Sequence, residues 1–324
     1  MFSKLYAITW TTFIETIRQP VFNVLLWTAL FWMVVFGPSL SAYSLDSGKD
    51  VKILQDVALA TILLYGLLAS AFSAAHVISR EIESRSILTV ISKPVPRPLF
   101  LIGKFLGVSG ALTVGVYLLS LALLMLVRHG VMETVADKFD QPVLVFGLGA
   151  ILVSLVAAGF GNYVYGWHFT TALTAWVVPL GTAAFALVLF FGKQWEIQPP
   201  TKDFGNLQLF YALMNILFAV LILGAFATAL ATRFSQVTTL ILCAAVFLFG
   251  LLSDYYLGGQ QQPFLYQLGF YALPNFQYFW LGDPLTQDLV IPGEQVARCA
   301  AYAALYMGAI LALGIALFQT REVS

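Results

Sequence analysis

The chain has 324 residues, of which 60% are hydrophobic and only 10% carry a formal charge. Its formal net charge is zero and its mean hydropathy is +0.87. Soluble domains contain about a quarter charged residues, so this composition excludes a surface covered by water, and the balanced charge excludes the basic footprint of a nucleic-acid-binding protein. We therefore expect an integral membrane protein.

Long apolar runs recur along the chain, each close to the roughly 20 residues that a helix needs to cross a bilayer. Backbone groups in lipid must bond within their own segment, so these runs predict helices. The predicted fold class is all-α, a polytopic transmembrane helical bundle with about eight spans. The predicted spans are 21–43, 57–79, 102–127, 142–161, 170–192, 208–231, 236–256 and 297–318.

Residues 1–20 precede the first span and have an amphipathic pattern. Leu5 and Phe13 fall on an apolar helical face, whereas Lys4 and Glu15 fall on the opposite face. Pro20 then breaks the helix before the first crossing. We expect residues 1–20 to form an interfacial helix on the inner side of the membrane.

Basic residues determine the expected orientation. They are concentrated between residues 80 and 104, in the connection between the second and third spans. Since basic loops stay in the cytoplasm, both termini are expected to be cytoplasmic, and the connection 257–296 is expected to be extracytoplasmic.

The predicted pair of spans 142–161 and 170–192 has two interpretations. Its connector, residues 162–169, is short and aromatic and contains no Lys or Arg. The pair either crosses the membrane twice around a cytoplasmic turn or forms a re-entrant hairpin. The bundle is therefore described as six spans plus an additional pair, and the orientation of the other spans is the same in both cases.

Small residues recur every four positions on two predicted spans. Such stripes allow two helix backbones to approach closely in lipid, within one chain or between two copies. Gly and Ala are also common in membrane helices, so ordinary composition is the alternative interpretation. The stripes are Gly103, Gly107, Ala111 and Gly115 on the third span, and Ala300, Ala304, Gly308, Ala312 and Ala316 on the last.

The sequence contains none of the patterns typical of catalysis or metal binding. His76, His129 and His168 are scattered over three segments, and Cys243 and Cys299 lie in or beside apolar runs. The phosphate-binding pattern Gly-x-x-x-x-Gly-Lys-Ser/Thr does not occur. We expect no catalytic residue, metal or bound cofactor in this chain, so any ATP-Mg would bind to a partner.

The most informative segment is residues 80–100, between two spans on the predicted inner side. It begins with charged residues, continues with an apolar face from Ile87 to Ile91, and ends in prolines that stop the helix. This order predicts a short amphipathic cytoplasmic helix on which a soluble partner can act. The expected docking residues are Glu81, Glu83, Arg85, Ser86, Ile87, Ile91, Lys93, Pro94 and Arg97.

The pattern Glu-x-Glu-x-Arg-Ser-Ile-x-x-Val-Ile-Ser-Lys-Pro-Val-x-Arg, followed by Gly-Lys, resembles the coupling-helix region of ABC type-2 permeases. It starts at Glu81 and ends at Lys104. Pro96 stands where the family commonly has Ser, and the Gly-Thr often found near Ser86 is absent, which leaves partner specificity open. Two weaker likenesses, at 231–236 and 273–284, extend the resemblance over most of the chain.

The resemblance implies that residues 1–324 form one permease domain of an ATP-driven exporter in the plasma (bacterial inner) membrane. It implies an ABC ATPase as a separate subunit, and a second permease copy or paralogue as a dimer partner. Lys93, Arg97 and Lys104 are expected to contact membrane lipid. Two other functions stay open: a non-transporting membrane anchor for a soluble complex, and a carrier that runs without ATP.

Overall fold

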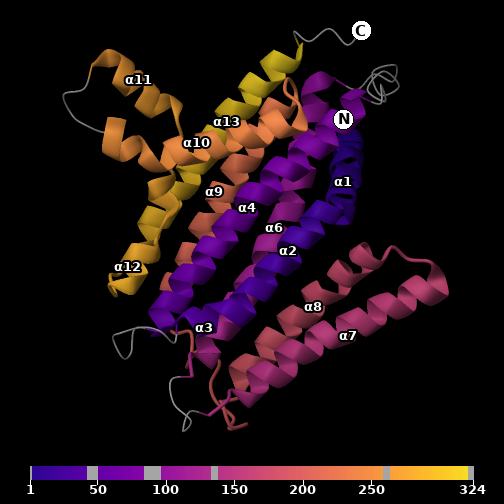
Figure 1. Cartoon of the computed structure of the whole chain (residues 1–324), viewed down its shortest axis with the longest axis vertical. Coiled ribbons are helices and arrows are strands. Elements are labelled where there is room, and N and C mark those ends of the chain that lie inside the picture. Colours follow the sequence, from indigo (N-terminus) through magenta and orange to yellow (C-terminus); the bar gives the residue numbers. More distant parts are fainter. Residues whose placement is uncertain (1, 42–49, 84–95, 133–137, 258–262, 320–324) are drawn as a thin grey trace.

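The computed structural model describes residues 2–41, 50–83, 96–132, 138–257 and 263–319 (Figure 1). Eight helices in these ranges are long and apolar enough to cross a membrane. The predicted all-α fold is therefore confirmed, and each predicted span corresponds to one of these helices. The spans are Pro20–Ser39, Asp50–Ile78, Arg97–His129, Gln141–Tyr165, Phe169–Phe190, Gln208–Ala231, Gln236–Leu257 and Gly293–Gln319.

The helix before the first span is α1 (Phe2–Arg18), and the first span combines α2 (Pro20–Phe31), a π-helical turn (Trp32–Phe36) and α3 (Gly37–Ser41). The remaining spans are α4 (Asp50–Glu83), α6 (Arg97–His129), α7 (Gln141–Tyr165), α8 (Phe169–Phe190), α9 (Gln208–Ala231), α10 (Gln236–Leu257) and α13 (Gly293–Gln319). The shorter elements are α11 (Phe264–Ala272), the 3-10 turn η2 (Phe276–Phe279) and α12 (Gly282–Thr286).

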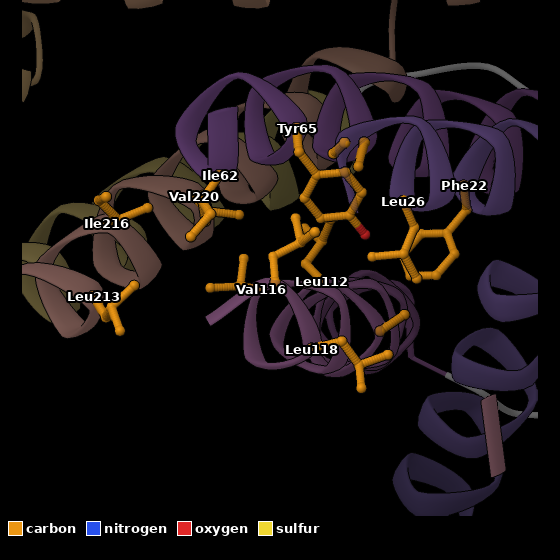
Figure 2. Close-up of a cluster of buried hydrophobic side chains, with 14 of the residues drawn as sticks. Phe22, Leu26, Ile62, Tyr65, Leu112, Val116, Leu118, Leu213, Ile216 and Val220 are labelled. Carbon is orange, nitrogen blue, oxygen red and sulfur yellow. The ribbon is translucent and has the colours of Figure 1, made fainter. Parts of the chain in front are cut away.

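Helices α4, α6 and α9 form the centre of the bundle (Figure 2). Ile62 and Tyr65 of α4 pack against Leu112 of α6 and Val220 of α9. Gly66 lets α9 approach closely, because a Cβ at this position would overlap the side chain of Val220. In lipid, burial of apolar surface does not drive helices together, because acyl chains are as apolar as the side chains. Close packing of this kind supplies the attraction between the helices instead.

The two termini lie at the same end of the bundle, at the top of Figure 1. The last turn of α4, the first turn of α6 and the end of α13 lie at this end too; we call it the terminal end. The opposite end contains α3, α12 and the ends of α6 and α8, and we call it the Arg128 end. There, Lys52 at the start of α4 forms an ion pair of 2.5 Å with Asp288, just beyond α12.

The break between α1 and α2 occurs at Gln19 and Pro20. Proline has no N–H to donate, so the helix is interrupted and carbonyl groups of the last turn of α1 lose their partners. The side-chain amide of Asn23 supplies some of the missing hydrogen bonds, since it donates to the carbonyl of Ile17 at 2.6 Å and to that of Gln19 at 3.0 Å. The predicted break at Pro20 is present.

Helices α7 and α8 form a hairpin that lies beside the main bundle (Figure 1). The turn is shorter than predicted and contains only residues 166–168, because α7 continues to Tyr165. Gly166 adopts φ +66° and ends α7, and the N–H of Trp167 donates to the carbonyl of Gly161 at 3.2 Å. A left-handed glycine at this position is the common way to end a helix.

Candidate functional site

The predicted docking segment connects α4 to α6 along the chain, and the last turn of α4 and the first turn of α6 both lie at the terminal end (Figure 1). The backbone at Glu81 and Glu83 continues α4. The residues Arg85, Ser86, Ile87, Ile91, Lys93 and Pro94 lie outside the described residues, as does the predicted amphipathic helix. The structure therefore describes what this segment connects, namely two of the three central helices.

Arg97, the first residue of α6, holds the end of α13. Its guanidinium donates to the carbonyl of Phe318 at 3.0 Å and to that of Gln319 at 2.8 Å, and it lies 5.6 Å from the ring centroid of Phe318. Carbonyls in the last turn of a helix lack partners and carry partial negative charge, so a cation stabilises them. Arg233, just after α9, also donates to a carbonyl there, that of Leu317.

Arg97 thus connects the start of α6 to the end of α13, and the bonded residues Arg97 and Phe318 are 221 positions apart in sequence. Phe100 extends this contact by stacking on Phe318, with ring centroids 6.0 Å apart. A displacement of the first turn of α6 would therefore move the end of α13 as well.

Lys104, in the second turn of α6, is buried against α1. Its side chain is 4% exposed, and Nζ lies 3.8 Å from Oε2 of Glu15 in α1. Because the ammonium group faces a neighbouring helix, it is not positioned to hold a lipid headgroup, and this prediction is wrong for Lys104 in the described conformation. Arg97 is likewise engaged by α13.

The small residues of α6 lie where other helices approach it most closely. A Cβ on Gly103 would stand 2.7 Å from Ile8, and one on Gly107 would stand 2.5 Å from Cβ of Thr12 and 2.7 Å from the backbone oxygen of Thr9. Gly115 makes room for the hydroxyl of Tyr65 in α4. Ala111 is fully buried. This stripe therefore packs within the chain, against α1 and α4.

The small residues of α13 have a different environment. Ala304, Gly308 and Ala312 are exposed, and no described atom would lie within 4 Å of a Cβ on Gly308. The buried face of α13 is formed instead by Cys299, Ala303, Gly314 and Phe318. The described part of the chain thus leaves this stripe uncovered.

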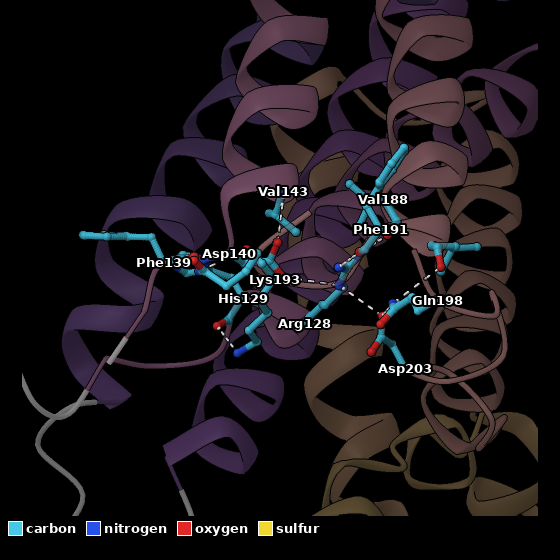
Figure 3. Close-up of polar contacts among 12 residues, drawn as sticks. Arg128, His129, Phe139, Asp140, Val143, Val188, Phe191, Lys193, Gln198 and Asp203 are labelled. Carbon is cyan, nitrogen blue, oxygen red and sulfur yellow. Dashed lines mark hydrogen bonds and ion pairs between the residues drawn. The ribbon is translucent and has the colours of Figure 1, made fainter. Parts of the chain in front are cut away.

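A buried ionic cluster at the Arg128 end ties the hairpin to the bundle (Figure 3). Nε of Arg128 lies 3.3 Å from Oδ2 of Asp140 and 3.1 Å from Oδ2 of Asp203. Its two terminal nitrogens donate to the carbonyls of Val188 and Phe191 at the end of α8. The side chains of Arg128 and Asp140 are 3% and 0% exposed.

The carboxylates of this cluster have further partners. Oδ1 of Asp140 caps α7 by accepting from the backbone N–H of Val143 at 3.1 Å. The amide of Gln198 donates to Oδ2 of Asp203 at 2.5 Å. A buried charge is tolerated when it is paired and hydrogen-bonded. Here the guanidinium forms ion pairs with both carboxylates through Nε, and its terminal nitrogens donate to the two carbonyls.

The sequence pattern alone does not indicate the ionic cluster, because Arg128 directly follows the predicted span 102–127, where a basic residue ordinarily faces water. A local signal was present: Asp140 followed by Gln141 and Pro142 is typical of a capped helix start. No periodic pattern connects Arg128 with Asp203, however, because their proximity results from the return of the α7–α8 hairpin.

The described residues contain no group of three or more His, Cys, Asp or Glu side chains that could hold a metal ion. Cys243 and Cys299 are free thiols and both are buried. The polar contacts that the fold makes between distant segments include the helix-end contacts of Arg97, the cluster around Arg128 and the pairs Lys104–Glu15 and Lys52–Asp288.

Residues 6–163 match a family model described as ABC-2 family transporter protein. The match begins in α1, includes the predicted docking segment and ends in α7, so the first helix of the additional pair belongs to the matched region. A search of curated proteins found no match.

Proposed function

We propose that the chain, which matches the ABC-2 transporter family model over residues 6–163, is the permease subunit through which a separate ABC ATPase drives export. A transport permease role in the membrane follows from the family and from the eight apolar helices. Coupling to ATP, the direction of transport and the partner subunit are the proposed parts. The observation that carries the coupling is the pair of hydrogen bonds from Arg97 to the end of α13.

In the proposed mechanism, the ATPase dimer closes on ATP and moves the docking segment between α4 and α6. The displacement reaches α13 through Arg97, and it reaches α1 through the Lys104–Glu15 pair and the close contacts at Gly103 and Gly107. Rigid helices in close contact transmit such shifts because a packed interface resists gradual deformation.

The proposed docking residues divide by chemistry. Glu81, Glu83 and Arg85 would form charge-assisted hydrogen bonds with the ATPase, and Ile87 and Ile91 would provide the apolar anchor. In this proposal ATP-Mg binds to the ATPase, and the permease itself is not catalytic.

The proposed assembly contains two permease copies or paralogues in the plasma membrane, with all termini in the cytoplasm. The uncovered face of α13, with Ala304, Gly308 and Ala312, supports a contact between copies, since small residues allow close helix approach in lipid. The burial of Arg128 supports this orientation. Arg128 lies at the end proposed to be extracytoplasmic, and basic residues that keep a loop in the cytoplasm are exposed loop residues, not cations buried in an ionic cluster.

The test is to co-express the chain with the ABC ATPase encoded beside it, purify through a tag on the permease, and measure ATP hydrolysis. The double variant Glu81→Lys/Glu83→Lys should reduce ATPase co-purification by an order of magnitude or more. Glu294→Lys is the matched control, since Glu294 is exposed at the start of α13 and pairs only with the exposed Arg298 among the contacts described.

Arg97→Gln separates docking from coupling. Although Arg97 is among the expected docking residues, its guanidinium binds the end of α13. The variant should therefore weaken the change in ATP hydrolysis that the permease causes by more than it lowers co-purification. Unchanged co-purification in the Glu81/Glu83 variant contradicts the docking role. Transport that persists without the ATPase indicates the carrier, and an ATPase that binds without any transport indicates the anchor.

A further inference from the structure

A cavity of about 500 Å³ lies between the bundle and the hairpin. Its wall comes from four spans: Trp27 of α2, Leu121 and Met125 of α6, Leu144 of α7 and Gly181 of α8 are among the lining residues. The lining is apolar except near the Arg128 end, where Ser39 and His129 contribute. No charged side chain lines the described wall.

The length of the cavity corresponds to one leaflet of a bilayer. Along α6 the lining residues extend from Leu118 to His129, which at 1.5 Å per residue is about 16 Å. Half of a hydrocarbon layer of about 30 Å is about 15 Å. The cavity therefore reaches from the membrane surface at the Arg128 end to about the midplane.

An apolar space of this size in a membrane does not stay empty. Lining side chains without neighbours lose their dispersion contacts, and water offers no replacement, because a cavity water needs two to four polar partners. The apolar material available in the bilayer is an acyl chain, and the cavity volume is within the range of ligand sites.

The polar end of the cavity favours a phosphate. Lys193 is exposed there, and Nζ donates to the backbone carbonyl of His129 at 3.1 Å. It also lies near Gly130, another lining residue. The carboxylate of Asp140, which caps α7 beside this end, is paired with Arg128 and buried, so it does not cancel the field of Lys193.

We propose that this cavity binds one acyl chain of a phospholipid from the leaflet at the Arg128 end, with the lipid phosphate beside Lys193. The hairpin and the bundle form the site together, since neither of them alone would enclose the acyl chain. This inference does not rest on an ATPase partner, and the test below needs none.

The test uses the purified chain in phosphatidylcholine vesicles that contain a trace of phosphatidylcholine with a diazirine on its acyl chain. After irradiation, adducts are mapped by peptide mass spectrometry. We expect them on Leu121 and Met125 of α6 and on Leu144, Leu148 and Ile151 of α7, which line the cavity.

A cavity-filling variant makes the result specific. A Cβ on Gly181 would lie 3.8 Å from Leu121, an ordinary contact, so Gly181→Leu extends into the cavity and should reduce these adducts several-fold. Gly159→Leu is the matched control, because no described atom would lie within 4 Å of its Cβ and it does not line the cavity. Its adducts should equal those of the unmodified chain, and thermal unfolding of both variants checks their folding.

A second probe tests the phosphate. Lys193→Gln should reduce labelling by the phospholipid probe but not by a diacylglycerol with the same diazirine chain. Equal effects on both probes would overturn the headgroup contact. Adducts spread evenly over the outer faces of the helices, or unaffected by Gly181→Leu, would show surface lipid only. Absence of adducts on the lining would mean that another occupant, such as a helix of a second copy, fills the space.

Discussion

The guanidinium of Arg128, in the last turn of α6, lies 3.3 Å from the carboxylate of Asp140, which caps the first turn of α7. One buried pair therefore joins the end of a central helix to the start of the peripheral hairpin. The same guanidinium reaches Asp203 and the carbonyls at the end of α8. The Arg128 end of the hairpin is thus held by charge, whereas the opposite end has an exposed hydrogen bond of 3.1 Å from Arg18 to Thr171.

Arg128→Gln should destabilise the chain strongly. It leaves the buried carboxylate of Asp140 without its cation, and breaking one partner of a buried pair typically costs about 3–5 kcal/mol. The midpoint of thermal unfolding in detergent, followed by tryptophan fluorescence, measures the change. Arg298→Gln is the control, because its pair with Glu294 is exposed and worth about 1 kcal/mol or less. Equal midpoints for both variants would contradict the structural importance of the cluster.

Gly107→Ala should displace α1 from α6. The new Cβ would stand 2.5 Å from Cβ of Thr12 and 2.7 Å from the backbone oxygen of Thr9, and a backbone atom cannot rotate away. Overpacking of this kind costs about 1–3 kcal/mol. Gly149→Ala provides the comparison: it also lies in a helix but has open space around its Cβ, so it should be neutral or stabilising by up to about 1 kcal/mol. The measurement is again the unfolding midpoint, and a neutral Gly107→Ala would mean that the contact is looser than described.

The hairpin should cross the membrane twice. Helices of 25 and 22 residues extend about 37 and 33 Å at 1.5 Å per residue, which is sufficient for a hydrocarbon layer of about 30 Å. After Cys243 and Cys299 are replaced by Ser, single cysteines at Tyr165 and Ile197, both exposed, should react with an impermeant maleimide from opposite sides of sealed vesicles. Labelling of both from the same side would support the re-entrant alternative.

The exposed stripe of α13 should lie at a contact between two permease copies. In the same cysteine-free background, Ala304→Cys should form a disulfide-linked dimer on mild oxidation in the membrane. Ala303→Cys, one residue away but fully buried within the chain, should not. A dimer from neither variant, with intact folding, would indicate that lipid covers this face or that the partner is a different chain.

The number and type of the membrane helices were predictable from the amino-acid sequence. In lipid each span must satisfy its own backbone hydrogen bonds, so the length and polarity of a run are sufficient to identify it. The break at Pro20 is equally local, since it depends on one missing N–H. The family resemblance at residues 81–104 is also a property of the linear pattern, and the family match at 6–163 includes it.

Only the tertiary structure decided which faces of these helices meet. The stripes on α6 and α13 have the same spacing, yet Gly107 lies against α1 and Gly308 has no described neighbour, because periodicity shows that a face exists but not what covers it. Lys104 and Arg128 are basic residues near span ends that any charge pattern would assign to water or lipid. Their burial depends on carboxylates brought in from other helices, Glu15 for Lys104, and Asp140 and Asp203 for Arg128. The cavity between the bundle and the hairpin has the same origin, since its wall forms only when four separate spans come together.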